Sequence, residues 1–282
     1  MVYSVDHESR DTRALMQRMH NFLKPGVFKL YLATLSLLLG ACSTVPTTFQ
    51  PTQPLSPAAY SHAAWDSLLH EHVRDGVVDY PAIAADKRLA DYLAQLKRLD
   101  PNSLPMREAR LAFWINAYNA FAMQGILEGL SPLTSSGKFQ YFVSKKYEVG
   151  GAFVNLYGLE HGILRPLREP RMHFTIVCAS RSCPKLLAEA YDPASLEKQL
   201  DQGAREFIND PTRNRFDTVG KVAYLSMIFD WFKEDFTAQG GSVLQYLAPY
   251  VNDPALAHEL EQGRYTIQYL DYDWHLNGPP PG

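Results

Sequence analysis

The sequence has few cysteines, three in 282 residues, and no Cys-x-x-Cys pair. That absence argues against a poised thiol-exchange site and against a structural zinc site with paired cysteines. Charge of one sign is also missing, because 27 basic and 30 acidic side chains leave a formal net charge of −3. The composition gives no electrostatic reason to expect nucleic acid as a partner. No internal repeat of solenoid or propeller length is present.

One apolar run, Val27 to Cys42, is too short to predict a membrane span, and its basic approach is typical of a signal peptide. It ends in Leu39-Gly40-Ala41-Cys42, which is typical of a bacterial lipobox. We expect residues 1–42 to hold a signal peptide with this lipobox, and Cys42 to carry diacylglycerol and palmitate. Acidic residues are unusual ahead of such a run, so we expect Met16 or Met19 as the start and residues 1–18 as an extension.

Ser43 stands where an aspartate would favour retention at the inner membrane. The sequence therefore predicts a Gram-negative lipoprotein of the outer membrane, held by lipidated Cys42 and facing the oxidising periplasm. Proline and threonine in residues 43–55 predict a disordered tether. Residues 56–277 then form one domain, and residues 278–282 a disordered tail.

The domain predicts helices first and strands later. Residues 57–74, 81–99 and 106–130 read as helices, and the third is apolar almost all round, as a buried central helix would be. Further helices are expected over 156–167, 184–191, 193–210, 242–251 and 254–263. Strands are expected over 172–178, 214–218, 221–228 and 264–274, with a hairpin turn at Gly150-Gly151. The class is α+β, with N-terminal helices packed on a mainly antiparallel sheet, in the manner of papain or transglutaminase folds.

Asn116 and Asn119 are polar side chains three residues apart within the apolar helix. A buried amide without a partner costs about 1–3 kcal/mol, so both need hydrogen bonds. They tie the helix to loop backbone, or one of them orients a catalytic imidazole or lines an oxyanion site.

The segment Leu159-Glu160-His161 offers a carboxylate beside a histidine, with Arg165 on the same helical face as His161. His161 is the best-placed candidate base, and a satisfied core histidine is the alternative. His173 lies at the start of an expected strand, facing away from Cys178, and a structural role is favoured for it.

Cys178 and Cys183 are the two thiols left if lipid takes Cys42. Cys183 precedes Pro184, which predicts a helix N-cap where unpaired N–H groups favour a thiolate. Cys178, at the end of an apolar strand, reads as a small buried hydrophobe. Four interpretations stay open: a disulfide, a zinc site with His161 or His173, a free nucleophilic Cys183, or a buried structural pair. The pattern favours the free nucleophile.

Several motifs in order resemble one family: RDGVVDYPAI, LAFWINAYNAF, LEHGILRPL, PRMHFTIVCASRSCP, LSMIFDWFKEDF and YLDYDWHLN. They resemble the domain of unknown function 547 family over about Leu68 to Asn277. The family residues matched are Asn116, Asn119, Glu160, His161, Arg165, His173, Cys178, Cys183 and Pro184. The resemblance implies a fold and does not imply an activity, and many bacterial members are secreted or lipid-anchored.

The sequence thus predicts a cysteine-dependent acyl transferase or amide hydrolase acting on peptidoglycan peptides or envelope proteins. Cys183 is the predicted nucleophile, His161 its base with His173 second, and Asn116 or Glu160 orients the imidazole. Asn119, Arg165 and Cys178 are predicted to be structural, and no metal or cofactor is expected. The alternative is a non-enzymatic envelope binding or scaffolding module in which Cys178 and Cys183 form a structural pair.

Overall fold

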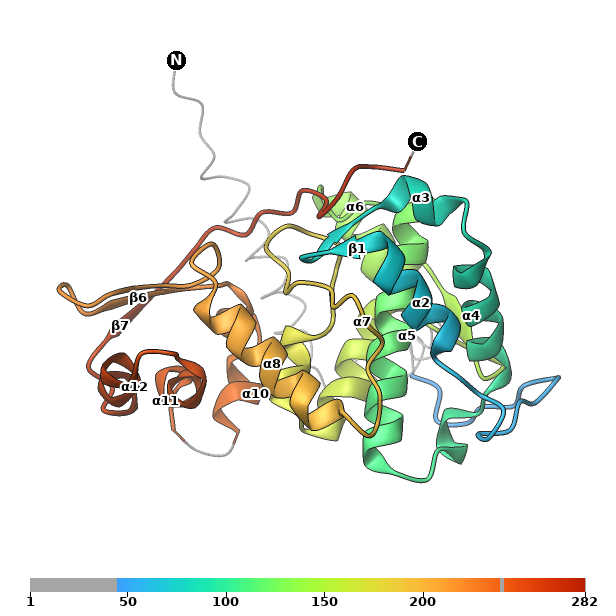
Figure 1. Ribbon diagram of the computed structural model, residues 1–282, viewed down its shortest axis with the longest axis horizontal. Coiled ribbons are helices and arrows are strands. Elements are labelled where there is room, and N and C mark those ends of the chain that lie inside the picture. Colours follow the sequence, from blue (N-terminus) through green and yellow to red (C-terminus); the bar gives the residue numbers. More distant parts are fainter. Residues whose placement is uncertain (1–44, 239–240, 282) are drawn as a thin grey trace, which may run out of the picture. The chain divides into compact units, whose positions relative to one another are not determined.

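The computed structural model describes residues 45–238 and 241–281, with about 50% helix and 11% strand. The predicted α+β class is confirmed. The strands are divided among two hairpins and one three-stranded sheet (Figure 1). The predicted signal peptide and the lipobox cysteine Cys42 lie outside the described residues. Within the described residues, no helix is both long enough and apolar enough to cross a membrane.

The helices alternate between long amphipathic or buried segments and single turns. The α-helices are α2 (Ala63–His72), α3 (Tyr80–Ala84), α4 (Lys87–Arg98), α5 (Arg107–Leu127), α6 (Ser135–Phe139), α7 (Leu156–Leu159), α8 (Leu196–Asn209), α9 (Ile228–Trp231), α10 (Lys233–Thr237), α11 (Val243–Leu247) and α12 (Pro254–Glu261). Turns of 3-10 geometry are Pro101–Ser103, Arg165–Leu167, Pro170–Phe174 and Ala248–Tyr250, and π-helical turns are Gln140–Ser144 and Glu160–Leu164.

Two hairpins turn on residues that tolerate positive φ. Strands β1 (Val73–Arg74) and β2 (Val77–Val78) are joined by Asp75-Gly76, whose φ values are 50° and 79°. Strands β3 (Tyr147–Val149) and β4 (Ala152–Val154) are joined by Gly150-Gly151, with φ values of 56° and 75°. Two consecutive residues at positive φ match the twist of antiparallel strands. The hairpin predicted at Gly150-Gly151 is confirmed.

Helix α5 is the centre of the first hydrophobic core. Every residue from Leu111 to Met123 is buried, as the apolar sequence of this helix predicts. Trp65 and Leu68 from α2 and Tyr92 from α4 belong to the same core and are fully buried. Burying a large apolar side chain contributes about 1.5–3 kcal/mol, so this core carries much of the domain's stability.

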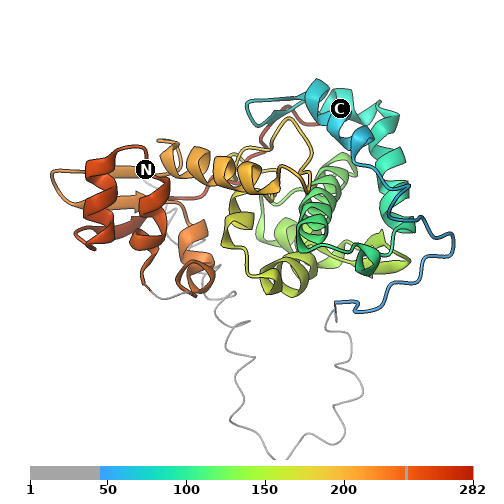
Figure 2. The same ribbon diagram turned by 60° about the horizontal axis from the view of Figure 1, so that its bottom comes forward.

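A second core lies under the C-terminal sheet. Strand β6 (Val222–Leu225) pairs antiparallel with β5 (Arg215–Asp217) and parallel with β7 (Thr266–Tyr269). Phe174 and Phe229 are among the rings that fill this core, with centroids 5.7 Å apart. In two views α8 lies between the helices around α5 and the group of α11, α12, β6 and β7 (Figure 1, Figure 2).

Two predicted elements are wrong. Residues 172–178 do not form a strand: Pro170–Phe174 is a 3-10 turn that Glu169 caps, followed by irregular chain. Residues 184–191 do not form a helix either, and Leu186 instead makes an isolated antiparallel bridge with Gly76. Proline at the first position favours a short helical turn as well as a long helix. At Pro170 the cap from Glu169 therefore outweighs the apolar pattern that predicts a strand.

Both ends of the described chain pack against the domain. Phe49 is 9% exposed and the centroid of its ring lies 5.9 Å from that of Trp114, so this side chain packs on the first core. After β7 the chain returns along the first half of the domain (Figure 1), where Asn277 N–H donates to Ala179 O at 2.9 Å.

Candidate functional site

Four charged or titratable side chains from distant elements form an acid–base cluster: Glu160, Arg165, His173 and Asp235. Arg165 donates Nε and Nη2 to the two oxygens of Asp235, at 2.6 and 2.9 Å. His173 Nε2 lies 2.8 Å from Asp235 Oδ2, and its other nitrogen, Nδ1, lies 3.9 Å from Glu160 Oε1. Asp235 therefore fixes both the arginine and the imidazole, and His173 turns its free nitrogen toward Glu160.

The local chain geometry places these groups. Glu160 is the first residue of the π-helical turn Glu160–Leu164 and Arg165 follows its last residue, and such turns are frequent at functional sites. His173 is the fourth residue of the 3-10 turn Pro170–Phe174. Asp235 belongs to α10, which follows the aromatic stretch around Phe232.

Burial separates the protonation states of the cluster. Burial raises the pKa of Glu160 to about 8, against the opposing charge of Arg165. Burial also lowers the pKa of His173, although the hydrogen bond to Asp235 works the other way. For Asp235 burial alone would raise the pKa, but the hydrogen bonds from His173 and Arg165 outweigh it and hold that pKa below its ordinary value. At neutral pH the cluster thus pairs a protonated carboxyl with a neutral imidazole.

Aromatic rings pack on both histidines of this region. The His173 ring stacks on Phe232 with centroids 4.1 Å apart, and the histidine is 2% exposed. His161 stacks on Tyr157 at 4.0 Å and its Nδ1 lies 3.1 Å from Tyr157 O. Burial, with the charge of Arg165, lowers the pKa of His161 to about 4. His161 is therefore a neighbour of the cluster, and His173 is the histidine that a carboxylate orients.

A second group, the disulfide cluster, consists of Cys178, Ser180, Cys183 and Tyr272. Cys178 and Cys183 are joined by a disulfide, and their Cα atoms are 6.4 Å apart, within the range that such a bond spans. Sγ of Cys183 accepts from Cys178 N–H at 3.0 Å, Tyr272 Oη at 3.2 Å and Ser180 Oγ at 3.3 Å. The sulfur atoms therefore lie among hydrogen-bond donors.

This geometry differs from the predicted role of Cys183. No helix follows Pro184, so Cys183 is not a helix N-cap, and no helical N–H groups form an oxyanion site there. Its sulfur is bonded to Cys178, and the described contacts of His161 and His173 include neither sulfur. Cys178 is partly exposed and not a buried hydrophobe.

Asn116 and the loop before α8 are joined by hydrogen bonds. Its Nδ2 donates to Tyr191 O at 2.8 Å, and its Oδ1 accepts from Tyr191 N–H at 3.0 Å and Trp65 Nε1 at 3.2 Å. The imidazole it contacts is that of His62, whose Nδ1 lies 3.1 Å from Nδ2. Asn116 therefore orients neither His161 nor His173.

Asn119 binds the segment that leads to the cysteines. Its Nδ2 donates to Thr175 O at 3.0 Å, and its Oδ1 accepts from Val177 N–H at 2.8 Å. Both contacts are buried, and they fix the chain just before Cys178. The amide of Asn119 thus satisfies loop backbone that lacks a strand partner.

Sequence reasoning missed two residues of the clusters, Asp235 and Tyr272. Asp235 lies in DWFKEDF, where a carboxylate among aromatic residues is the same signal that singled out Asn116. Tyr272 lies in the C-terminal segment. It is one of 16 tyrosines in the sequence, and no local pattern distinguishes it from the others. Long-range packing alone brings it to the cysteines.

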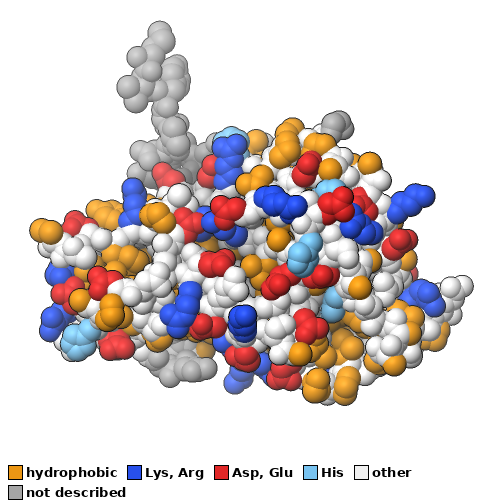
Figure 3. All heavy atoms as spheres, in the orientation of Figure 1, with side chains coloured by type: hydrophobic (Ala, Val, Ile, Leu, Met, Phe, Trp, Pro, Cys, Tyr) orange, Lys and Arg blue, Asp and Glu red, His pale blue; other side chains and the backbone are white. Residues whose placement is uncertain are grey.

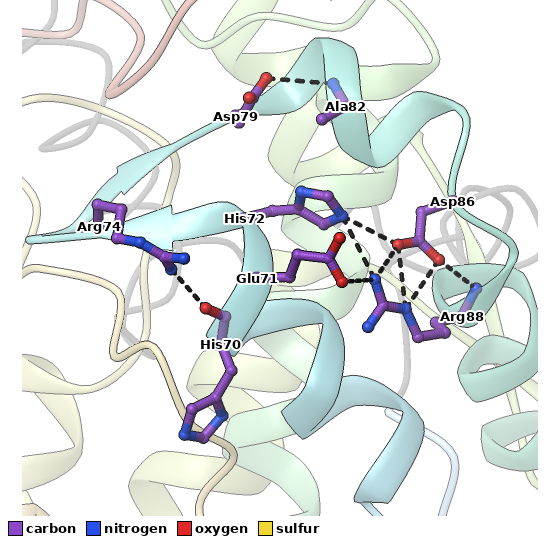
Figure 4. Close-up of polar contacts among 8 residues, drawn as sticks. All are labelled: His70, Glu71, His72, Arg74, Asp79, Ala82, Asp86 and Arg88. Carbon is purple, nitrogen blue, oxygen red and sulfur yellow. Dashed lines mark hydrogen bonds and ion pairs between the residues drawn. The ribbon is translucent and has the colours of Figure 1, made fainter.

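Another polar network joins α2 to the start of α4 (Figure 4). Asp86 caps α4 and accepts from His72 Nε2 at 2.9 Å, while Arg88 Nη2 donates to Glu71 at 2.6 Å (Figure 4). Glu71 and Arg88 are the more exposed partners, so the network reads as a helix-to-helix tie. Among the described residues, no group of three or more His, Cys, Asp or Glu side chains could hold a metal ion.

The surface offers no field of a single sign on the face drawn in Figure 3, where acidic and basic side chains are interspersed. Two depressions, of about 320 and 380 Å³, are lined from α4 with β3 and β4, and from the end of α8 with β5. Neither is lined by a residue of the two clusters.

Together these features define a class, an α+β domain with an aspartate-oriented histidine beside a buried carboxyl, and with a hydrogen-bonded disulfide. Residues 101–208 match the model of the family described as "Protein of unknown function, DUF547", which confirms the resemblance over that region. The match spans Glu160, His173 and both cysteines, whereas Asp235 and Tyr272 lie beyond it. No curated protein matches the chain, and no solved structure does.

Proposed function

We propose that the chain is an envelope enzyme that hydrolyses amide or ester bonds by general acid–base catalysis at the acid–base cluster. The observation that carries the proposal is the pair of contacts made by His173. Its Nε2 is bound to Asp235 at 2.8 Å, and its Nδ1 makes no hydrogen bond with a described residue and faces Glu160 at 3.9 Å. A histidine held by a carboxylate on one nitrogen is set up as a base on the other.

Each group then has a role. His173 Nδ1 takes a proton from the attacking water, and Asp235 holds the ring and stabilises the imidazolium that forms. Glu160, protonated because burial raises its pKa to about 8, gives its proton to the leaving group. Arg165 fixes Asp235. Water replaces the predicted Cys183 as nucleophile, because that sulfur is bonded to Cys178.

The open side of the cluster is that of Arg165 and Asp235. Their side chains keep 24% and 22% of their surface exposed, against 1% for His173. A substrate would approach there and meet Glu160, which keeps 11%. We place the enzyme at the outer membrane, anchored through Cys42 and facing the periplasm, where peptidoglycan peptides and envelope proteins are the available substrates.

The test is hydrolysis of p-nitrophenyl acetate, alanine p-nitroanilide and peptidoglycan fragments by the full chain. We expect Glu160→Gln and His173→Gln to lose about 100-fold or more in kcat/KM. His275→Gln, at an exposed histidine, is the matched control and keeps full activity. The rate should fall as pH rises through about 8, because Glu160 loses its proton, and Glu160→Gln removes this limb. No hydrolysis of any probe by folded protein, or wild-type rates in Glu160→Gln, would overturn the proposal.

The double variant Cys178→Ser/Cys183→Ser separates this mechanism from cysteine catalysis. Water attack predicts retained activity in the folded double variant, whereas a cysteine nucleophile predicts complete loss. Comparing the activity of the folded double variant with that of the wild type also shows whether the disulfide affects catalysis only by stabilising the fold.

A non-enzymatic binding or scaffolding module is the second candidate. It is favoured by the hydrogen bonds of Asn116 and Asn119, which both serve loop backbone. In that case the Cys178–Cys183 pair is structural. The wild-type protein then hydrolyses none of the probes, and Glu160→Gln changes only the stability of the fold.

A further inference from the structure

The two cysteines of the disulfide differ in exposure. Cys183 is 3% exposed and belongs to the first hydrophobic core, whereas Cys178 is only partly buried at its edge. Cys178 is therefore the residue of the pair that a thiol from solution can reach more readily. The sulfur that would leave in such an attack is the buried one.

Three donors lie around that buried sulfur, and two of them also contact Sγ of Cys178, Ser180 Oγ at 3.3 Å and Tyr272 Oη at the longer distance of 3.6 Å. Cys178 N–H lies 3.0 Å from Sγ of Cys183, Tyr272 Oη 3.2 Å and Ser180 Oγ 3.3 Å. Ser180 has one hydroxyl proton, which it donates either to this sulfur or to Tyr272 Oη at 3.2 Å; in the second arrangement Tyr272 and the Cys178 N–H remain as donors to the sulfur. A disulfide sulfur is a weak acceptor, but a thiolate gains strongly from such donors. The arrangement therefore stabilises the reduced form of Cys183 more than the oxidised form.

The loop that carries the donors is fixed independently of the sulfur–sulfur bond. Backbone N–H groups of Arg181 and Ser182 donate to His275 O and Asp273 O, at 2.8 and 3.2 Å. Arg213 donates Nε to Cys183 O at 2.8 Å and Nη2 to Arg181 O at 3.1 Å. These bonds do not involve the sulfur atoms, so the donor set stays in place when the disulfide is reduced.

We propose that Cys178 and Cys183 are a redox-active pair that exchanges its disulfide with the thiols of a peptide or small-molecule substrate. A substrate thiolate attacks Sγ of Cys178, the bond to Cys183 breaks, and its electron pair leaves as the Cys183 thiolate. A second substrate thiolate then attacks the substrate sulfur of the mixed disulfide, and Cys178 leaves. The substrates are oxidised to a disulfide, the pair is reduced to a dithiol, and two protons pass from the substrate thiols to the cysteines. A second disulfide compound restores the pair by the reverse exchange.

The leaving thiolate decides how readily this exchange runs. Exchange is faster and reduction more favourable when the leaving thiolate is stabilised. The pair achieves this with side-chain and loop donors, without the Cys-x-x-Cys spacing or a helix N-terminus. The activity is independent of the proposed hydrolysis, since it uses none of Glu160, His173 or Asp235.

The test equilibrates the full chain with reduced and oxidised glutathione and counts free thiols by maleimide labelling. We expect Tyr272→Phe to shift the equilibrium about tenfold toward the disulfide, equal to about 30 mV for a two-electron couple. Ser180→Ala should shift it in the same direction. Tyr224→Phe, at a tyrosine of β6 whose ring contacts Arg215, is the matched control and should leave the equilibrium unchanged.

A second measurement tests the proposal if Tyr272→Phe or Ser180→Ala does not fold. In Cys178→Ala only Cys183 of the pair remains, and its thiolate is followed by absorbance near 240 nm during a pH titration. The proposal predicts a midpoint below the ordinary cysteine value of about 8.5. A midpoint at or above that value, or a disulfide that glutathione reduces only in denaturant, overturns it. So does a Tyr272→Phe or Ser180→Ala equilibrium equal to that of Tyr224→Phe.

Discussion

His173 Nε2 lies 2.8 Å from Asp235 Oδ2, although 62 positions separate the two residues in the chain. The contact joins a 3-10 turn to a short helix of the C-terminal half and fixes which imidazole nitrogen is free. Arg165 holds the same carboxylate, so the histidine cannot turn without breaking a partly buried network. Glu160 is the remaining neighbour of the ring and makes none of these bonds. Its protonation can therefore be changed by substitution without breaking the contacts among Arg165, His173 and Asp235.

Glu160→Gln should change how stability depends on pH. A carboxyl whose pKa in the folded protein is about 8, against an ordinary 4.5, adds stability that is complete below pH 4.5. That contribution is lost as pH rises to about 8. The neutral glutamine avoids this loss, so we expect the variant to be roughly 2–4 kcal/mol more stable than wild type at pH 8 and close to it at pH 4. Urea unfolding at both values measures the difference.

Glu234→Gln is the control for that measurement. Glu234 is an exposed carboxylate in α10, next in sequence to Asp235 and so in the same electrostatic neighbourhood. Its substitution should leave the pH dependence of stability as in wild type. A Glu160→Gln curve parallel to wild type between pH 4 and pH 8 would show that burial does not raise the pKa of Glu160.

How far the sequence predicts this molecule depends on the range of the interactions. Helix α5 and the Gly150-Gly151 hairpin follow from local patterns in the sequence. These are an almost continuous apolar run for the helix and two residues that accept positive φ for the hairpin. The strand expected over 172–178 failed because an apolar run needs a partner strand, and here Asn119 supplies the hydrogen bonds instead. Glu160 and His173 could be selected as polar residues in apolar settings, but their partner Asp235 could not be assigned, since only the tertiary fold brings it near.

Asn119→Ala should destabilise the domain through the loop before the cysteines. The substitution leaves the buried Thr175 O and Val177 N–H without their side-chain partner, at a cost of about 2–4 kcal/mol. Gln124→Ala, on the same helix, removes only a surface contact with Glu128 and should cost less than about 1 kcal/mol. Equal losses in the two variants by chemical unfolding would contradict the structural role of Asn119.

Reducing the disulfide should cost the folded protein a small, measurable amount of stability. The bond closes a short loop, for which the loop-entropy relation gives about 2 kcal/mol. We expect unfolding in urea with dithiothreitol to shift by that amount and to keep one cooperative transition, because backbone hydrogen bonds hold the loop separately. Cys178→Ser/Cys183→Ser should not respond to dithiothreitol. Loss of the transition on reduction would show that the bond is indispensable to the fold.

Gly76 and Gly129 allow the cost of positive φ to be separated from the cost of lost space. Their φ values are 79° and 84°, but a Cβ at Gly76 would lie 2.7 Å from Lys185 Cβ, whereas at Gly129 no atom lies within 4 Å. Left-handed backbone costs an alanine about 1–2 kcal/mol, so Gly129→Ala should lose only that amount. Gly76→Ala adds a collision between the β1–β2 turn and the segment after Cys183, and should lose about 2–4 kcal/mol. Thermal and urea unfolding of both variants measures which loses more stability. Equal losses would show that the segment after Cys183 moves to accommodate the new Cβ without loss of stability.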